Sequence, residues 1–213
     1  MKRQAQAPEI PADPVRRAVL GALVGIPAAG LVGYAAHSLS AAGTVFELAP
    51  TLACGDDDDA DPTPSQTEGP YFTPNSPERL SLLERGANGT RLVVSGRVLS
   101  TFCDPMAGAL LDFWQADADG EYDNRGYRLR GHQYSDGEGR FRLETIVPGV
   151  YTGRTRHIHV KVQARGGRVL TTQLYFPNEP QNTRDRIYSP KLLMDVAGDG
   201  GVQHGSFNFV LRA

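Results

Sequence analysis

The feature that most restricts the fold is an alternation of strand-like segments with short turns, which runs from residue 91 to residue 212. The segments are rich in β-branched and aromatic residues, and one of them, 139–144, alternates between polar and apolar positions. Turns such as Asp117-Ala118-Asp119-Gly120 separate them. The expected strands are 91–99, 109–115, 139–144, 157–162, 169–176 and 206–212.

This pattern predicts an all-β domain, an antiparallel β-sandwich with short helices and long active-site loops. The chain holds 24 glycines and 15 prolines, which favour many turns over long helices. Helical patterns occur only in two short segments, 77–84 and 183–187. Strands do not alternate with helices, so the pattern does not favour a parallel sheet.

The N-terminal region has the order of an export signal. Residues 1–17 are polar and end in Arg16-Arg17, and an apolar stretch of small residues follows at 18–36. The arginine pair resembles a twin-arginine signal, so we expect residues 1–42 to direct export to the cell envelope or the medium. A retained membrane anchor is the alternative, because about 20 apolar residues can span a bilayer.

Residues 43–66 are expected to form an acidic, proline-containing linker ahead of a domain at 67–213. Five acidic residues lie within 56–61, and their mutual repulsion favours a solvated segment. Cys54 and Cys103 are the two cysteines, and in an oxidising compartment they could form a disulfide. Cys54 could instead carry a lipid, which would anchor the chain to a membrane.

The chemistry is concentrated around His157-Ile158-His159. On a strand, residues two apart point to the same face, so both imidazoles could bind one metal ion. Two histidines with this spacing are also common as ordinary strand residues. The formal net charge of −2 and the absence of a basic stripe argue against a nucleic-acid partner.

Five motifs in order make the sequence similar to the intradiol ring-cleavage dioxygenases, the family that cleaves catechol and protocatechuate. They are Thr67-Glu68-Gly69-Pro70-Tyr71-Phe72, residues 108–122 ending in Gly120-Glu121-Tyr122, Pro148-Gly149-Val150-Tyr151, Arg154-Thr155-Arg156-His157-Ile158-His159 and Thr172-Gln173-Leu174-Tyr175-Phe176. The similarity covers 67–176 closely and extends more loosely to the C-terminus.

The resemblance implies a ferric iron centre held by Tyr122, Tyr151, His157 and His159. Phenolate is a hard anionic donor and suits Fe³⁺, whereas a zinc site would more often use cysteine or carboxylate. The implied reaction opens a small aromatic diol with O₂ between its two hydroxyl-bearing carbons and gives a cis,cis-muconate-type product. Tyr151 would also act in catalysis, by accepting a proton from the diol.

The resemblance further places Arg154 and Gln173 in catalysis beside the substrate. A salt bridge that braces the loop is the alternative for Arg154, and a hydrogen bond between strands is the alternative for Gln173. Tyr71 could form a wall of the substrate pocket or pack in the core. Arg156 is expected to be structural, while Trp114 and Tyr175 are expected to pack.

The sequence departs from the common family pattern at Thr155-Arg156, where Pro-Ala is usual, so the loop could be less rigid. The chain is shorter than many relatives, and we expect no room in it for their helical N-terminal dimerisation segment. A different homo-oligomer is therefore possible. Two other functions remain open at this point. One is a secreted β-sandwich module that binds aromatic or carbohydrate ligands without turnover, and the other is an exported metal-binding protein.

Overall fold

The computed structural model describes residues 60–86, 88–151, 153–198 and 201–212, and within these ranges almost all regular structure is β-strand. The strands are β1 (Arg91–Ser100), β2 (Leu110–Trp114), β3 (Arg130–Tyr134), β4 (Arg140–Ile146), β5 (His157–Gln163), β6 (Leu170–Tyr175), β7 (Asp195–Gly198), β8 (Val202–Ser206) and β9 (Phe209–Leu211). The all-β prediction is confirmed. The alternation pattern did not indicate β3, β7 or β8, since the expected strand 206–212 corresponds to β9.

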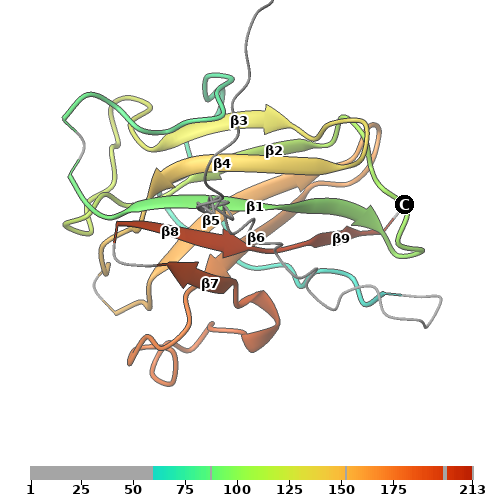
Figure 1. Cartoon of the computed structure of the whole chain (residues 1–213). Helices are drawn as coiled ribbons and strands as arrows, with labels where there is room; N and C mark the ends of the chain where they lie inside the picture. Colours follow the sequence, from blue (N-terminus) through green and yellow to red (C-terminus); the bar gives the residue numbers. More distant parts are fainter. Residues whose placement is uncertain (1–59, 87, 152, 199–200, 213) are drawn as a thin grey trace, which may run out of the picture. The chain divides into compact units, whose positions relative to one another are not determined.

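The strands form two sheets (Figure 1). The first has the order β4-β1-β8-β7, with β9 beside the end of β1, and the second has the order β3-β2-β5-β6. All pairs in the second sheet are antiparallel. The first sheet is mixed, because β1 is antiparallel to β4 but parallel to β8 and β9.

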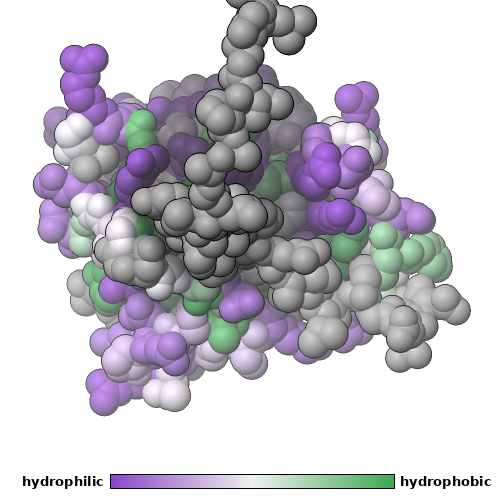
Figure 2. Space-filling model, in the orientation of Figure 1, coloured by the Kyte–Doolittle hydropathy of each residue, from purple (hydrophilic) through white to green (hydrophobic). Residues whose placement is uncertain are grey.

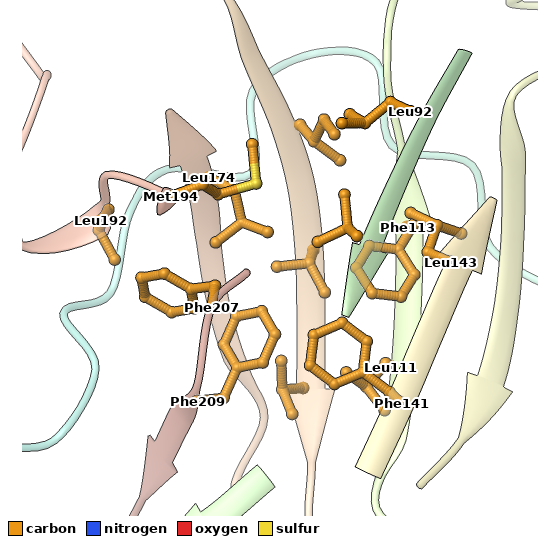
Figure 3. Close-up of a cluster of buried hydrophobic side chains, with 14 of the residues drawn as sticks. Leu92, Leu111, Phe113, Phe141, Leu143, Leu174, Leu192, Met194, Phe207 and Phe209 are labelled. Carbon is orange, nitrogen blue, oxygen red and sulfur yellow. The ribbon is translucent and has the colours of Figure 1, made fainter. Parts of the chain in front are cut away.

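The hydrophobic core lies where the inner faces of the two sheets meet (Figure 3). Alternate residues of β5 point into it, and Ile158, Val160 and Val162 are completely buried. Phe113 of β2 packs there against Phe141 of β4, with ring centroids 6.0 Å apart. The alternation of β5 consequently turns its two histidines toward the outer face of the second sheet.

A chain segment that precedes the first strand covers this outer face. We call residues 63–79 the strap. The strap reaches β6 through the Gln66 amide, which donates to the Thr171 carbonyl at 2.8 Å. It crosses β2 where the Phe72 ring meets Trp114, with centroids 4.9 Å apart, and it ends beside His132 of β3. The strap shields side chains that an open sandwich would expose to water.

Residues just before the expected domain start at residue 67 also contact the domain. The Ala60 amide donates to the Thr101 carbonyl and the Thr63 amide to the Val210 carbonyl, at 2.8 and 2.9 Å. Thr63 also accepts a hydrogen bond from the Val210 amide through its hydroxyl. Residues 60–66 are thus attached to the domain by backbone hydrogen bonds, which composition does not reveal. The proposed signal at 1–42 and Cys54 lie outside the described residues.

The two short helices expected at 77–84 and 183–187 are not present. Residues 77–84 are extended, with β-bridges from Glu78 to His132 and from Ser81 to Glu144. Residues 183–187 form successive turns. In the described part of the chain, the only helical element is the single 3-10 turn η1 (Pro190–Leu192).

In the view of Figure 2 the described residues are mostly hydrophilic, and the hydrophobic ones form small separate groups. Over the described ranges, no helix has the length and apolar character required to cross a membrane.

Candidate metal centre

His157 and His159 place two imidazole nitrogens close together on the outer face of β5. Their Nε2 atoms are 3.1 Å apart, and both side chains are buried. His157 Nδ1 lies 2.6 Å from the Thr155 carbonyl oxygen, and a carbonyl can only accept, so Nδ1 carries the proton. The His157 Nε2 lone pair is therefore free to bind a metal ion.

The His159 ring is fixed by its neighbours on both sides. The ring stacks on Trp114 of β2, the residue opposite it in the sheet, with centroids 4.8 Å apart and planes 7° apart. Trp114 is buried as expected, but on the face away from the sandwich core. On the strap, Gly69 approaches the same imidazole so closely that an added Cβ would lie 3.5 Å from its Cε1.

The two tyrosines implied by the resemblance join this pair of histidines. Tyr122 comes from the loop after β2, and its hydroxyl lies 3.4 Å from His157 Nε2. Tyr151 comes from the loop before β5, with its ring centroid 5.9 Å from that of Tyr122. The Tyr151 hydroxyl is 2.8 Å from the hydroxyl of Tyr71, and the Tyr71 ring stacks on Tyr122 at 4.4 Å. The structure thus brings four side chains from two loops and one strand together, with Tyr71 of the strap as a fifth member.

Backbone contacts hold the two tyrosine loops against each other. The Asp117 carbonyl accepts a hydrogen bond from the Gly149 amide at 2.6 Å. A Cβ on Gly120, whose φ is +86°, would lie 2.5 Å from the Val150 carbonyl oxygen. These close approaches require glycine, and they explain the Gly-x-Tyr and Pro-Gly-x-Tyr spacing. Asp117 also orders its own loop, since its Oδ1 accepts the amides of Asp119 and Glu121.

The buried donors favour binding of a cation. Burial, with a smaller contribution from Arg154, lowers the pKa of His157 to about 4, and burial likewise holds the pKa of His159 well below its ordinary value. Both imidazoles are therefore neutral near pH 7. Burial also raises the pKa of Tyr122, and His159 Nδ1 is buried without a hydrogen-bond partner among the described residues. A highly charged cation would stabilise the Tyr122 phenolate and use the imidazole lone pairs.

The donor set fits ferric iron. Two phenol oxygens and two imidazole nitrogens form the cluster, and hard anionic oxygen donors suit Fe³⁺. In the ranges that the structure describes, no group of three His, Cys, Asp or Glu side chains could hold a metal ion. A structural zinc site built from cysteine or carboxylate ligands is accordingly not seen there.

Arg154 and Gln173 lie in one hydrogen-bonded network beside the histidines. Arg154 Nη2 donates to Gln173 Oε1 at 2.6 Å, and Gln173 Nε2 donates to the Thr67 carbonyl at 3.0 Å. Arg154 Nε forms a 2.9 Å ion pair with Asp185. The salt bridge considered as the alternative for Arg154 is thus present, whereas the Gln173 side chain binds the strap and not an adjacent strand. Their contacts also hold them next to His159, which lies opposite Gln173 across the β5–β6 pair.

Three residues of the site were not indicated by the sequence. Asp185 binds Arg154 from a turn-rich segment that carries no motif. Tyr175, expected only to pack, donates from its hydroxyl toward Gln173 Oε1 at 3.0 Å. Arg130 of β3 is buried and contacts both the Tyr71 and the Asp123 carbonyls, at 2.6 and 2.8 Å. Its position in β3 could have been noticed only if that strand had been predicted.

The unusual Thr155-Arg156 pair has partners of its own. The Thr155 hydroxyl donates to Asn182 Oδ1 at 2.7 Å, and Arg156 Nε forms a 2.8 Å ion pair with Glu179. The expected structural role of Arg156 agrees with this contact. Polar side-chain contacts therefore hold this loop in place of the usual Pro-Ala pair, although the sequence suggested a less rigid loop.

Known proteins resemble the chain over this same region. Residues 67–213 match the model of a protein family described as Dioxygenase. Chlorocatechol 1,2-dioxygenase from Pseudomonas sp. (strain P51) is 28% identical over 172 residues, a match that covers 68% of each chain. The protocatechuate 3,4-dioxygenase beta chain from Burkholderia cepacia is 32% identical over 154 residues, which cover 58% of this chain and 65% of that one.

Two solved structures extend the comparison. One is the dioxygenase domain of a dioxygenase carbohydrate-binding protein fusion from the cellulolytic bacterium Streptomyces sp. SirexAA-E. It is 57% identical, with a TM-score of 0.70, and the match covers 72% of this chain and 99% of that one. The other is 3-chlorocatechol 1,2-dioxygenase from Rhodococcus opacus 1CP, which is 32% identical with a TM-score of 0.66, over 76% of this chain and 75% of that one.

Proposed function

The chain belongs to the intradiol ring-cleavage dioxygenases, and on that premise we propose that it is a non-haem Fe(III) enzyme that opens a small aromatic diol with O₂. The ring bond between the two hydroxyl-bearing carbons breaks, and both oxygen atoms enter the product, a cis,cis-muconate-type diacid. One observation carries the proposal: Tyr122 and Tyr151, from two separate loops, lie with the buried His157 and His159 in a single cluster.

The proposed ligands of the ferric ion are these four side chains. Bound there, Fe(III) would act as a Lewis acid that draws electron density from the diolate and opens its ring to attack by O₂. The charge supports this assignment, since two phenolates offset most of the positive charge of the ion while the buried histidines remain neutral.

Tyr151 is the proposed proton acceptor for one hydroxyl of the diol. Its hydroxyl faces Tyr71 at 2.8 Å, so the protonated phenol has a hydrogen-bond partner ready. Tyr71 is in turn fixed by the buried Arg130, which donates to its backbone carbonyl. The protonated Tyr151 side chain would therefore be held beside Tyr71.

Arg154 and Gln173 are the proposed substrate-facing polar groups. The Arg154 guanidinium can stabilise negative charge that develops on the ring, and a preorganised donor of this kind contributes a few kcal/mol. Gln173 fixes the orientation of the guanidinium through its Oε1 atom. The strap and Trp114 cover the His159 ring and exclude water from it.

The substrate class proposed is the unfused aromatic diol. The named relatives act on chlorocatechol, protocatechuate and hydroxyquinol, all of which carry adjacent ring hydroxyls. A panel of such diols, offered to iron-loaded protein in an oxygen electrode, tests the proposal. We expect a purple-red protein, from tyrosinate-to-iron charge transfer, and oxygen uptake with at least one diol. A colourless protein that consumes no oxygen with any diol would instead fit a binding module.

We also propose that residues 1–42 export the chain, on the basis of Arg16-Arg17 and the apolar stretch after them. Expression with the natural N-terminus, followed by cell fractionation and N-terminal sequencing, tests this. Export predicts a shortened chain outside the cytoplasm. A full-length chain in the cytoplasm would contradict it, and loss of export in an Arg16→Lys, Arg17→Lys variant would support the twin-arginine route.

A further inference from the structure

The loop ahead of the first histidine is tied to one distant segment by three pairs of side chains. Three consecutive loop residues take partners that are themselves spaced three residues apart. The pairs are Arg154 with Asp185, Thr155 with Asn182 and Arg156 with Glu179. We call Glu179, Asn182 and Asp185 the clasp.

Asp185 makes the most extensive contacts of the three. Its side chain is only 2% exposed. Its Oδ2 accepts hydrogen bonds from Arg154 Nε and from the Thr155 amide, both at 2.9 Å. Its Oδ1 accepts the Ile187 amide at 3.1 Å, so the carboxylate is oriented by its own segment. A buried carboxylate held by backbone amides is a rigid counter-charge for a guanidinium.

The clasp also determines where the first histidine lies. The Thr155 carbonyl accepts the proton of His157 Nδ1, while the Thr155 amide and hydroxyl are both bound to the clasp. The clasp therefore acts on two functional groups at once. It fixes the guanidinium of Arg154 through a direct ion pair, and it fixes the imidazole of His157 through the backbone of Thr155.

We propose that the clasp is the positioning device of this site, and that Asp185 is the residue that sets the Arg154 guanidinium in place for the diol. The proposal rests on the proposed function, because Arg154 matters only if a diol is bound and opened beside it. The side-chain hydrogen bonds of the clasp go to the loop and to its own segment, and not to the histidine nitrogens or the tyrosine hydroxyls.

The test compares Asp185→Asn with a matched control, Asp136→Asn, in the full iron-loaded chain. Asp136 makes the same kinds of contact, with Arg140 Nε at 2.8 Å and the Glu138 and Arg140 amides, but at the opposite end of the strands. We expect Asp185→Asn to lower kcat by between about tenfold and a hundredfold, because small misplacements of a catalytic group have effects of that size. KM should change by less than about threefold and the iron content should not change, since the variant misplaces a group that acts in the transition state.

Hydrogen exchange provides a second reading that needs no turnover. Asp185→Asn should speed the exchange of amides 153–157 by about tenfold or more, and Asp136→Asn should not, since protection follows the local free energy of opening. Wild-type kcat in Asp185→Asn, or unchanged exchange in this loop, would overturn the proposal. So would an equal loss of kcat in both variants.

Two further outcomes separate the clasp from the proposed function. Should the wild type consume no oxygen with any diol, the proposed function fails, and the exchange data alone decide whether the clasp fixes the loop. Should Asp185→Asn fail to fold, Asn182→Ala takes its place. That variant removes only two side-chain hydrogen bonds, the one accepted from the Thr155 hydroxyl and the one donated by Asn182 Nδ2 to the Phe176 carbonyl. Faster exchange at 153–157 in that variant supports the clasp, and unchanged exchange overturns it.

Discussion

The hydroxyl oxygens of Tyr71 and Tyr151 lie 2.8 Å apart, although 80 residues separate them in the chain. One belongs to the strap over the second sheet and the other to the loop before β5. Their contact means that the phenol proposed to take the substrate proton is bound by a second phenol, which itself stacks on Tyr122 at 4.4 Å.

Replacement of Tyr71 by phenylalanine should slow turnover and leave the iron in place. The variant removes one neutral hydrogen bond to Tyr151, and a bond of that kind is worth about 1 kcal/mol, or roughly a fivefold change in kcat. Oxygen uptake under saturating diol measures it. Tyr127→Phe is the control, because the Tyr127 hydroxyl also makes one hydrogen bond, to the Pro74 carbonyl. Equal rates in the two variants would remove Tyr71 from the reaction.

The two proposed tyrosine ligands should respond differently to loss of the hydroxyl. The Tyr122 hydroxyl points at His157 Nε2, whereas that of Tyr151 faces Tyr71. We expect Tyr122→Phe to weaken iron binding by at least about a hundredfold. Replacing a residue that only hydrogen-bonds to a metal ligand weakens binding by up to about a hundredfold, and loss of a ligand itself should cost more. Tyr151→Phe should retain iron, shift the visible band and slow turnover. Iron titration with visible spectroscopy measures both, and an unchanged band in Tyr151→Phe would exclude that residue from the centre.

Acid should destabilise the metal-free protein in a window set by the buried histidines. The pKa of His157 is about 4 in the fold and about 6.5 when unfolded, so the unfolded chain takes up the proton first as the pH falls. Stability from the neutral imidazole is complete above pH 6.5 and is lost as the pH falls toward 4. The expected slope is about 1.4 kcal/mol per pH unit for each such histidine. Urea unfolding across this range tests it. His157→Gln should have the shallower slope, and an unchanged slope would contradict the account.

Gly120→Ala should disturb both tyrosine loops. The new Cβ would meet the Val150 carbonyl oxygen at 2.5 Å in a backbone conformation with φ +86°. We expect a loss of at least about 2 kcal/mol in the free energy of unfolding, together with weaker iron binding. Gly166→Ala is the matched control, because φ is +70° there and nothing lies within 4 Å. Its cost should be only about 1 kcal/mol, from backbone conformation alone. Equal losses in the two variants would mean that the loops do not pack as described.

The sequence was most informative where a local period decides the geometry. The i, i+2 spacing of His157 and His159 on a strand predicts two imidazoles on one face, and the structure has them there. The motif Pro-Gly-Val-Tyr151 could be recognised by resemblance alone, because its residue spacing does not predict that Tyr151 lies near Tyr122. The pairing of those loops depends on glycines whose close contacts appear only in three dimensions.

Contacts between segments that are distant in the chain could not be predicted from the sequence. Residues 60–66 read as a linker because the acidic run before them dominates the composition, yet their amides bind β6 and β9. Residues 77–84 have helical spacing, but their hydrogen bonds go to β3 and β4 instead. Asp185 lies among turns, and its importance depends on a partly exposed arginine 31 residues away.

The reaction of iron-loaded protein with catechol under ¹⁸O₂ tests the central claim most directly. Cleavage between the two hydroxyl-bearing carbons predicts a muconate-type diacid that carries two ¹⁸O atoms, one in each carboxylate, by mass spectrometry. The Tyr122→Phe variant should form none of it. A product that retains both hydroxyls, a ring opened beside the diol, or full activity without the Tyr122 phenol would contradict the account.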